Sequence, residues 1–287
     1  MKMFTKLVLV SSMAISANAM AMQSMDDAAL SAATGQDGIN IGIALDSTGI
    51  SIDKLYLHDN DGLQTSTNIT GATGVAGAIA IDGITITQTG TDNLLDLVID
   101  TDAGTSGEAF LNIAASVGAV DISIGSIGVA PSNGASLTDT TTAVRGVTGT
   151  PTEILTGLDL SLGAISANVQ LGATPQGAMI KLDSTLEGGL TISNLGINDA
   201  TGGGQIYLDN IYVRGTGNTT GDLNIDTDIS VTTSGLQLKN NSTQGMNVYL
   251  EGVRLGASAT GATNASIGDI EIQGLNVGTS TITISGH

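Results

Sequence analysis

Aliphatic residues recur along this chain in groups of eight. Each group reads apolar, variable, apolar, then two small or polar residues, then apolar, variable, apolar, as in Ile-Glu-Ile-Gln-Gly-Leu-Asn-Val at Ile270–Val277. We call this pattern the octet. It occurs eight times, at Ile50–Leu57, Ile79–Ile86, Ile122–Val129, Leu160–Ala167, Leu190–Ile197, Ile206–Val213, Val248–Leu255 and Ile270–Val277.

The octet predicts a bent β-strand. Strand side chains alternate between faces, so the two apolar pairs of an octet would point to opposite faces of a flat strand. Either a bulge or a two-residue hairpin turn at the middle pair would bring all four apolar residues to one face. Asp82-Gly83 would suit a hairpin, but Asp53-Lys54 and Gln273-Gly274 are poor hairpin pairs. We therefore expect a bend that builds an aliphatic face and carries no chemistry.

The composition of the chain and the spacing of the octets predict an all-β fold. Glycine contributes 40 of 287 residues, aromatic residues are 2%, and tryptophan is absent, which is typical of an aliphatic core with many tight turns. Successive octets start between 16 and 43 residues apart, whereas a regular solenoid keeps one period. We expect an elongated, mainly antiparallel bent sheet or sandwich, with an irregular β-solenoid as the alternative.

The amino terminus predicts export. A basic start containing Lys2 and Lys6 precedes the apolar run Leu7–Ile15 and an Ala-Asn-Ala motif that ends at Ala19. This is the composition of a secretory signal peptide with cleavage after Ala19, or after Ala21 at the overlapping Ala-Met-Ala motif, and the run is too short for a transmembrane helix. The predicted organisation is a signal peptide at 1–19, a short helical segment at 20–37 and one β-rich domain at 38–287 with a loop at 131–151.

Net charge narrows the range of partners. The chain has 27 acidic and eight basic residues, and removal of Lys2 and Lys6 leaves six basic residues and a formal net charge of −21. Such a charge disfavours binding to nucleic acid and to anionic lipid surfaces. Without cysteine there is neither a disulfide framework nor a thiolate metal site. We expect a protein of the periplasm, the cell surface or the extracellular space.

One segment resembles a known family. Residues 25–41 read Met-Asp-Asp-Ala-Ala-Leu-Ser-Ala-Ala-Thr-Gly-Gln-Asp-Gly-Ile-Asn-Ile. They resemble the mature start of the FilA-like pilus-assembly protein family of gram-negative bacteria. Residues 52–62 and 281–287 also resemble members of this family. The resemblance implies an exported, surface-associated structural protein, and it brings no catalytic residue to this chain.

Residues for catalysis are scarce. The chain has no cysteine, and only His58 and the terminal His287 offer an imidazole base. No Gly-x-Ser-x-Gly sequence stands at a strand-to-helix turn, the position of the nucleophile in α/β-hydrolases. We therefore expect a protein without enzymatic activity, catalytic residues or an organic cofactor.

Three acidic loops are weak candidates for calcium. Ca²⁺ is bound by several oxygen ligands around a tight turn, but none of these loops matches a complete twelve-residue calcium loop. Asp and Gly are also common turn residues, and this interpretation is favoured for each loop. The candidate ligands are Asp59 and Asp61, Asp100, Asp102 and Glu108, and Asp226 and Asp228.

Two groups of residues are candidates for protein contacts. Tyr, Trp and Arg dominate interface energetics, and the second and seventh octet positions, which should face away from the aliphatic side, hold Tyr56, Tyr207, Tyr212, Tyr249 and Arg254. The last predicted strand carries Ile282 and Ile284, and a free strand edge there could add to the sheet of a neighbouring molecule. The alternatives are scattered surface tyrosines and a strand that closes its own sheet.

Two functions follow. The first is a structural or assembly component of a surface filament or pilus system, acting through contacts with other subunits or with itself. The second is a periplasmic or extracellular module that holds a hydrophobic ligand, such as a lipid, against its aliphatic face. Ice or glycan binding by Thr85, Thr87, Thr89, Thr281 and Thr283 would need regular ranks of threonine, and the irregular octet spacing argues against them.

Overall fold

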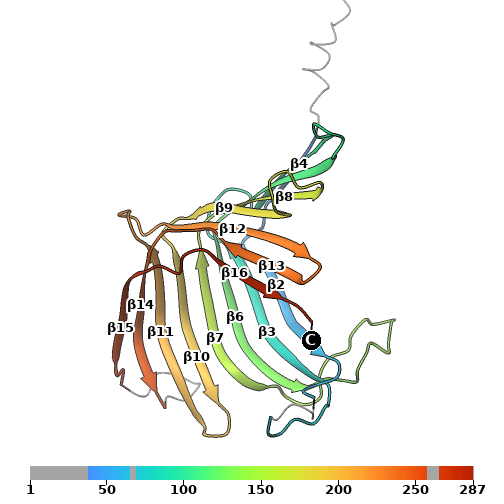
Figure 1. The fold of residues 1–287 in the computed structure, drawn as a ribbon. Coiled ribbons are helices and arrows are strands. Elements are labelled where there is room, and N and C mark those ends of the chain that lie inside the picture. The colour runs from blue at the N-terminus through green and yellow to red at the C-terminus, as the bar shows by residue number, and fades with distance from the viewer. Residues whose placement is uncertain (1–37, 65–68, 257–264, 287) are drawn as a thin grey trace, which may run out of the picture. The chain divides into compact units, whose positions relative to one another are not determined.

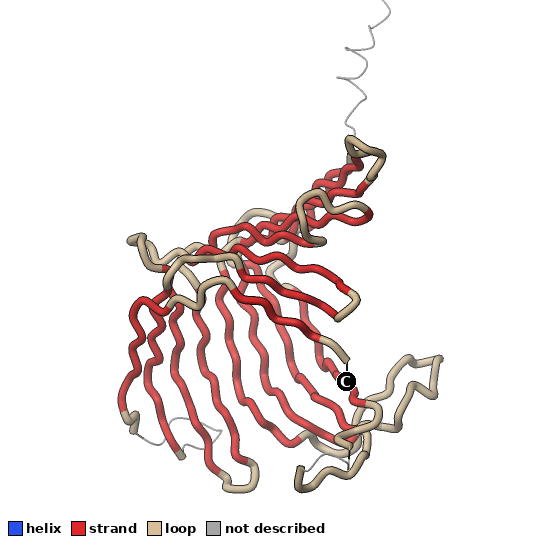
Figure 2. Tube along the Cα trace, viewed as in Figure 1, coloured by secondary structure: helices blue, strands red, loops and turns tan. Residues whose placement is uncertain are grey.

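The computed structural model describes residues 38–64, 69–256 and 265–286. Residues 40–287 form one compact unit. The predicted signal peptide, its cleavage site and the helical segment 20–37 lie outside the described residues. The described residues form sixteen β-strands without a helix, and so they contain no helix able to span a membrane (Figure 2).

Two antiparallel sheets of eight strands make up the fold (Figure 1). The first, here called the octet sheet, has the order β15-β14-β11-β10-β7-β6-β3-β2. Its strands are β2 (Ile50–Asp59), β3 (Gly77–Gln88), β6 (Val120–Pro131), β7 (Thr152–Leu162), β10 (Leu190–Asp199), β11 (Gly204–Gly215), β14 (Met246–Leu255) and β15 (Gly268–Leu275).

The second sheet, here called the companion sheet, has the order β1-β4-β5-β8-β9-β12-β13-β16. Its strands are β1 (Ile39–Ile43), β4 (Leu95–Asp102), β5 (Phe110–Val117), β8 (Ile165–Gly172), β9 (Ile180–Leu186), β12 (Leu223–Thr232), β13 (Gly235–Asn240) and β16 (Ser280–Ile284). The fold is thus all-β and sandwich-like, as the sequence predicts, and neither sheet closes on itself.

The chain crosses between the sheets in a regular rhythm. Two consecutive strands enter the octet sheet, the next two enter the companion sheet, and this alternation continues from β2 to β15. Each new pair is added beside the previous pair of its own sheet, so that β3 pairs with β6 and β5 with β8. The connection from β6 to β7 is formed by residues 132–151, and the predicted loop at 131–151 differs from it only in Pro131, which ends β6.

The octets lie in the octet sheet, with one exception. Six lie wholly inside its strands, and Ile270–Val277 begins in β15 and continues two residues beyond it. Positive φ angles occur at the middle pair in Gly83, Asn194, Gly252 and Gly274. Because the strands continue through these residues, the predicted bend is confirmed and the hairpin alternative is wrong.

The prediction that Leu160–Ala167 forms one bent strand is wrong. This segment crosses from β7 into β8 and therefore spans two sheets. The strand β7 bends instead at Gly157, with a φ of 59°. Leu155, Leu158 and Leu160 supply three of the four apolar positions around that bend, and Glu153 stands at the first. Because Glu153 is not apolar, the eight residues around this bend do not match the octet pattern.

Strand register aligns the apolar residues into ranks across each sheet. In the octet sheet, one rank crosses all eight strands through directly paired residues: Ile50, Ile86, Ile122, Leu160, Ile192, Ile211, Leu250 and Ile270. A second rank crosses seven: Leu55, Ile81, Ile127, Leu155, Ile197, Ile206 and Leu255. The bends make these ranks possible, since they restore one face to both halves of each strand.

Candidate ligand-binding face and sheet edges

The ranks of the octet sheet form an aliphatic face that remains accessible. Side chains between two closed sheets normally reach core packing. Here no large side chain among the described residues is fully buried, and many members of the ranks are exposed. Leu57 is 69% exposed and Val129 is 42% exposed, although both occupy terminal octet positions. A face of this kind marks a site for a ligand or for another protein.

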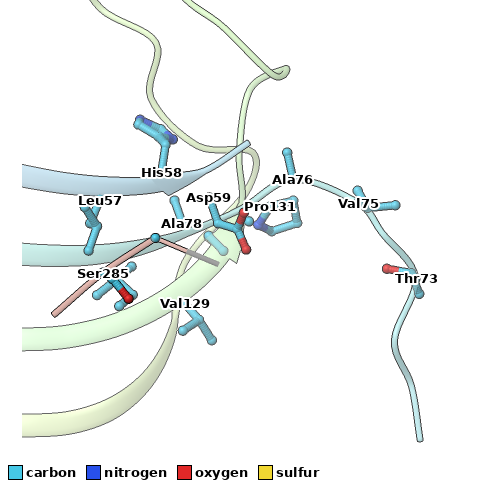
Figure 3. Close-up of a pocket in the computed structure, with 14 residues that line it drawn as sticks. Leu57, His58, Asp59, Thr73, Val75, Ala76, Ala78, Val129, Pro131 and Ser285 are labelled. Carbon is cyan, nitrogen blue, oxygen red and sulfur yellow. The ribbon is translucent and has the colours of Figure 1, made fainter. Parts of the chain in front are cut away.

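A cavity of about 1040 Å³ opens at one end of this face. Its floor comes from Leu57 of β2, Ile79 of β3 and Val129 of β6, which pair side by side across three strands. Val75 and Pro131 extend the apolar lining, and Ser285, which follows β16 of the companion sheet, lies on its other side (Figure 3). The cavity therefore lies where residues of both sheets approach each other.

His58 stands beside the cavity but on the other face of β2 from Leu57 (Figure 3). Burial lowers the pKa of its imidazole, and the positive charge of Arg145 lowers it further. Its Nδ1 lies 2.8 Å from Oγ of Ser132, which donates a hydrogen bond to the Gly134 carbonyl. Either nitrogen tautomer of His58 is compatible with this contact, so the direction of the hydrogen bond between Nδ1 and the Ser132 hydroxyl is open.

The companion sheet also presents an aliphatic rank. It crosses seven strands through Ile99, Ile113, Val169, Ile180, Ile229, Leu238 and Ile282. Leu223 and Ile225 lie on the same face of β12, and a smaller cavity of about 160 Å³ places them with Met246 of β14 and Val277. Both cavities thus combine residues of the two sheets, which indicates that the aliphatic faces turn toward each other.

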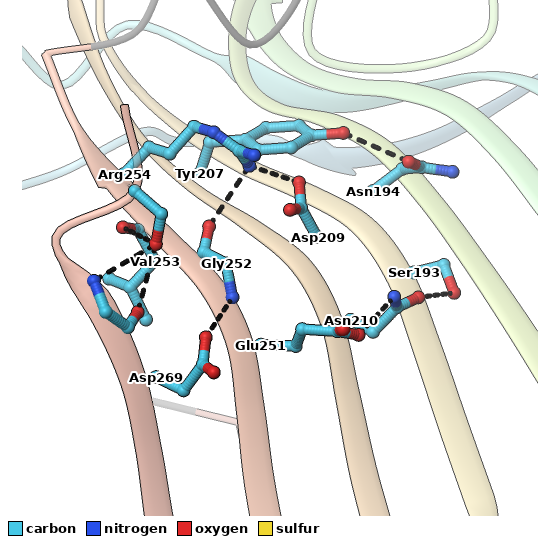
Figure 4. Close-up of polar contacts among 12 residues, drawn as sticks. Ser193, Asn194, Tyr207, Asp209, Asn210, Glu251, Gly252, Val253, Arg254 and Asp269 are labelled. Carbon is cyan, nitrogen blue, oxygen red and sulfur yellow. Dashed lines mark hydrogen bonds and ion pairs between the residues drawn. The ribbon is translucent and has the colours of Figure 1, made fainter. Parts of the chain in front are cut away.

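A belt of polar contacts follows the bends on the octet sheet (Figure 4). Asn210 accepts a hydrogen bond from Ser193 over 2.6 Å and donates one to Glu251 over 2.8 Å. Further along, Asp269 of β15 accepts from the backbone of Gly252 over 2.9 Å. The Asp269 contact satisfies a backbone N–H at the bend of β14, whereas the other two contacts join side chains of neighbouring strands.

Tyrosine and arginine side chains take part in the same belt. Tyr207 donates to Asn194 over 3.0 Å, and the guanidinium of Arg254 lies 5.9 Å from the ring of Tyr207 while it pairs with Asp209 (Figure 4). This hydrogen bond to Asp209 is also the main reason why the pKa of Arg254 is raised. Tyr212 faces Tyr249 across β11 and β14.

The structure therefore brings together four of the five predicted contact residues. Tyr207, Tyr212, Tyr249 and Arg254 gather on β11 and β14. Tyr56 lies on β2, the opposite edge strand of the octet sheet, where its ring contacts His58. The second and seventh octet positions explain the common face of these residues, whereas strand order separates Tyr56 from the other four.

The predicted calcium ligands take part in turns and in an ion pair. Asp102 accepts from the backbone of Gly104 over 2.6 Å, and Asp59 accepts from Gly62 over 3.1 Å. Asp228 accepts from Asn241 over 2.9 Å and pairs with Lys181 over 3.4 Å, and the Asn241 hydrogen bond is the main cause of its lowered pKa. The described residues contain no group of three or more metal-ligating side chains.

The remaining candidate calcium ligands are divided between strands and connections. Asp61 follows β2, Asp100 lies in β4, Glu108 lies in the connection from β4 to β5, and Asp226 lies in β12. Asp226 is 3.4 Å from the Asn241 amide that also binds Asp228, and Asp100 accepts from Thr101 over 2.7 Å. Calcium binding stays a prediction without support from this geometry.

Four strands form the edges of the two sheets in the described part of the chain: β1 and β16 in the companion sheet, and β2 and β15 in the octet sheet. Every residue of β1, β15 and β16 is exposed. Ile282 and Ile284 pair with Leu238 and Leu236 of β13 and remain 59% and 56% exposed. β16 thus adds to its own companion sheet and still presents an edge.

Sequence reasoning missed the cavity and the ranks that lead to it. The signal was present, because Leu57, Ile79 and Val129 are each the first or last residue of an octet. What the sequence lacked was the register that places these three residues side by side, together with the position of Ser285.

Comparisons with known proteins give one match. A family model described as "Family of unknown function (DUF6160)" matches residues 1–142. No curated protein matches the chain, and no solved structure matches it.

Proposed function

We propose that this protein holds a hydrophobic ligand, such as a lipid, between its two sheets. The observation that carries this proposal is the combination of unbroken aliphatic ranks with the absence of any fully buried large side chain among the described residues. A folded protein that keeps so much aliphatic surface accessible gains free energy when that surface is covered, at about 25 cal/mol for each Å² removed from water. The main cavity, bordered by Leu57 and Val129, offers an entrance.

The ranks favour a long, flexible hydrocarbon chain over a compact ligand. They run across seven or eight strands rather than converging on one closed pocket. Ligand sites for compact molecules are enclosed and place a few polar groups for orientation, whereas these ranks are uniformly aliphatic. A chain of methylene groups can follow such a surface without leaving a polar atom unpaired.

Native mass spectrometry of the protein purified without detergent tests the proposal. We expect an adduct that disappears under denaturing conditions, and saturable binding of a fluorescent long-chain fatty acid to the ligand-free protein. A folded protein with neither adduct nor fatty-acid binding would contradict it. So would a chain that binds the fatty acid only after residues 20–37 are removed, because its own segment would then be the occupant.

A matched pair of variants on β2 locates the binding face. Leu57→Glu places a charge on the aliphatic face, and its high exposure makes the fold tolerant of the change. Ser51→Glu adds the same charge to the opposite face of the same strand, where Ser51 pairs with Thr85. We expect at least tenfold weaker fatty-acid binding for Leu57→Glu and unchanged binding for Ser51→Glu. Equal affinities would place the fatty acid elsewhere.

A second candidate function is a structural or assembly component of a surface filament. The four exposed edge strands favour it, since unpaired strand edges are templates for pairing with another chain. The resemblance of residues 25–41 to the FilA-like family supports the same proposal. Electron microscopy of the purified exported chain, beside immunogold labelling of intact cells, tests it. Fibres or a labelled cell surface would support this function, whereas monomers and an unlabelled surface would contradict it.

A further inference from the structure

The aliphatic floor of the main cavity ends in a carboxylate. Leu57, Ile79 and Val129 pair side by side across β2, β3 and β6. Two residues further along the first two of these strands, Asp59 pairs with Gly77. Residues two apart on a strand share a face, so Asp59 lies on the same face as Leu57, at the end of the floor. Both side chains line the cavity (Figure 3).

The remaining polar groups of the lining carry no charge at neutral pH. Thr73 and Ser285 contribute hydroxyl groups. His58 lies on the other face of β2 from Leu57, and the lowered pKa of its imidazole keeps the ring neutral at pH 7. None of the described residues that line the cavity is a lysine or an arginine. The side chains of the lining therefore supply a negative charge and hydroxyl groups, but no positive charge.

Five of the six basic residues of the exported chain are engaged away from this cavity. Arg214 donates to the Leu190 carbonyl and to the Thr191 hydroxyl, and Lys239 faces Asp228 across β13 and β12. The other three form ion pairs: Lys54 with Asp82, Lys181 with Asp228, and Arg254 with Asp209. None of the five lines the main cavity.

The sixth basic residue, Arg145, interacts on the side of β2 that faces away from the floor. Its guanidinium donates to Asn60 over 2.6 Å and also to the Gly134 carbonyl. Its positive charge acts on His58, whose ring lies on that same side. Arg145 does not line the cavity, so it supplies no partner for a negative group on the floor.

We infer that the main cavity takes a lipid with an uncharged, hydroxyl-bearing headgroup, such as a monoacylglycerol or a long-chain alcohol. This inference rests on the proposed lipid-binding function and specifies the chemical class of its ligand. The hydrocarbon chain lies over Leu57, Ile79 and Val129, and a headgroup hydroxyl donates to the carboxylate of Asp59. An ionised carboxylate accepts hydrogen bonds at both oxygens, and such charge-assisted bonds are stronger than bonds between neutral groups.

A carboxylate or phosphate headgroup fits this end of the cavity poorly. Proteins usually hold such groups with arginine or lysine, and the lining has neither. The headgroup would instead meet the like charge of Asp59. The exported chain has a formal net charge of −21, which adds a repulsion that reaches about 10 Å at 0.1 M salt. An uncharged headgroup avoids both effects.

Titration calorimetry with two lipids of the same acyl chain tests the inference. Dodecanoic acid and its monoacylglycerol are titrated separately into the exported chain at pH 7.5 and low ionic strength, each below its micelle concentration. We expect the monoacylglycerol to bind about tenfold more tightly, and added salt to narrow this difference because it screens the repulsion of the acid. Equal affinities, or tighter binding of the acid, would overturn the inference.

Two variants on β2 form a matched pair. Asp59→Asn removes the charge at the end of the floor and keeps a side-chain oxygen for the Gly62 backbone N–H, from which Asp59 accepts over 3.1 Å. Asp53→Asn removes the same charge from the bend of this strand, outside the cavity lining. We expect Asp59→Asn to strengthen binding of dodecanoic acid about fivefold and Asp53→Asn to leave it unchanged. Equal effects would overturn the role of Asp59.

A third variant reverses the charge of the lining. Ser285→Lys places an ammonium group in the cavity, and Ser285 is exposed, so the fold tolerates the longer side chain. We expect this variant to bind dodecanoic acid more tightly than the natural chain does, with little change for the monoacylglycerol. An unchanged preference between the two lipids would overturn the inference, because the headgroup would then lie away from Ser285 and Asp59.

The outcomes separate this inference from the function on which it rests. Equal affinities for the two lipids would overturn the headgroup class and leave lipid binding standing. Binding of neither lipid, together with the absence of a lipid adduct in native mass spectrometry, would overturn both.

Discussion

The phenolic hydroxyl of Tyr249 donates a hydrogen bond to Oδ2 of Asp269 over 2.7 Å and thereby fastens β15 to β14. The other carboxylate oxygen of Asp269 accepts from the Gly252 backbone at the bend of β14. This backbone hydrogen bond, followed by that of Tyr249, lowers the pKa of Asp269. One acidic side chain thus holds an edge strand to the sheet and caps a bend.

This arrangement predicts a pH-dependent loss of stability in Asp269→Asn. A carboxyl whose folded-state pKa is lowered stabilises the fold above its unfolded pKa of about 3.9, and that stabilisation disappears as pH falls through the folded-state pKa. We expect the urea midpoint of Asp269→Asn to lie below that of the natural chain at pH 7, and the gap between the two midpoints to be narrower at pH 2. Asp121→Asn on β6 removes the same charge and serves as the control. A gap of equal size at both pH values would contradict the prediction.

The bends predict different responses at two glycines. Gly83 and Gly252 both have a φ of 68°. A Cβ at Gly83 would meet no atom within 4 Å, whereas one at Gly252 would lie 2.0 Å from a carboxylate oxygen of Asp209. Gly83→Ala should therefore show the backbone cost alone, about 1–2 kcal/mol. Gly252→Ala must also displace Asp209 from Arg254 and should cost more.

Chemical denaturation of the two alanine variants measures this difference. Double variants that also carry Asp209→Asn test whether the cost at Gly252 arises from Asp209, because this replacement removes the ion pair of Asp209 with Arg254. We expect the effects of Asp209→Asn and Gly252→Ala to be less than additive, and those of Asp209→Asn and Gly83→Ala to be additive. Equal costs in free energy of unfolding at both glycines would contradict the prediction, because Asp209 would then move away from the new Cβ without destabilising the protein.

The aliphatic ranks predict an unusual response to truncation of a side chain. Ile211 lies in the middle of the eight-residue rank and remains partly accessible. In a closed core, replacement of Ile by Ala costs about 2–5 kcal/mol. We expect Ile211→Ala to cost less than this in the ligand-free protein, and to cost more when a saturating long-chain fatty acid covers the rank. Thermal denaturation with and without the fatty acid measures both values.

An unchanged cost for Ile211→Ala in the presence of fatty acid would mean that the ligand does not contact this rank. Leu208→Ala provides a control on the same strand, since Leu208 is buried without a ligand. Its cost should fall within the closed-core range in both conditions.

The octet predicted the bent strands and their aliphatic face because these features depend on local sequence. Alternation of side chains and a residue able to adopt positive φ are visible in a window of eight positions, as at Ile79–Ile86 with Gly83. The pattern did not identify the bent strand β7, because Glu153 occupies a position that is apolar in the other octets. A pattern of eight residues cannot recover a strand that lacks one of its apolar positions. The irregular octet spacing is explained by the companion strands inserted between the octet strands.

The cavity and the contacts around Tyr207 depend on non-local pairing. Leu57 and Val129 are 72 residues apart and meet through the shared neighbour Ile79. Tyr56 shares its octet position with Tyr212, yet it lies on the far edge strand because strand order follows the crossings between sheets. No property of the individual octets specifies that order, so the sequence predicted a common face without predicting which tyrosines would meet.

The amino terminus provides the last prediction. Lys2, Lys6 and the apolar run Leu7–Ile15 predict a signal peptide, and Ala17-Asn-Ala19 places cleavage after Ala19, so the exported protein should begin at Met20. Intact-mass measurement of protein recovered from the periplasm or the cell surface of a gram-negative host checks this. Ala19→Arg should block processing, since cleavage requires a small residue at this position, whereas Ser24→Arg leaves the site intact. An uncleaved natural chain in the cytoplasm would contradict export and, with it, both proposed functions outside the cell.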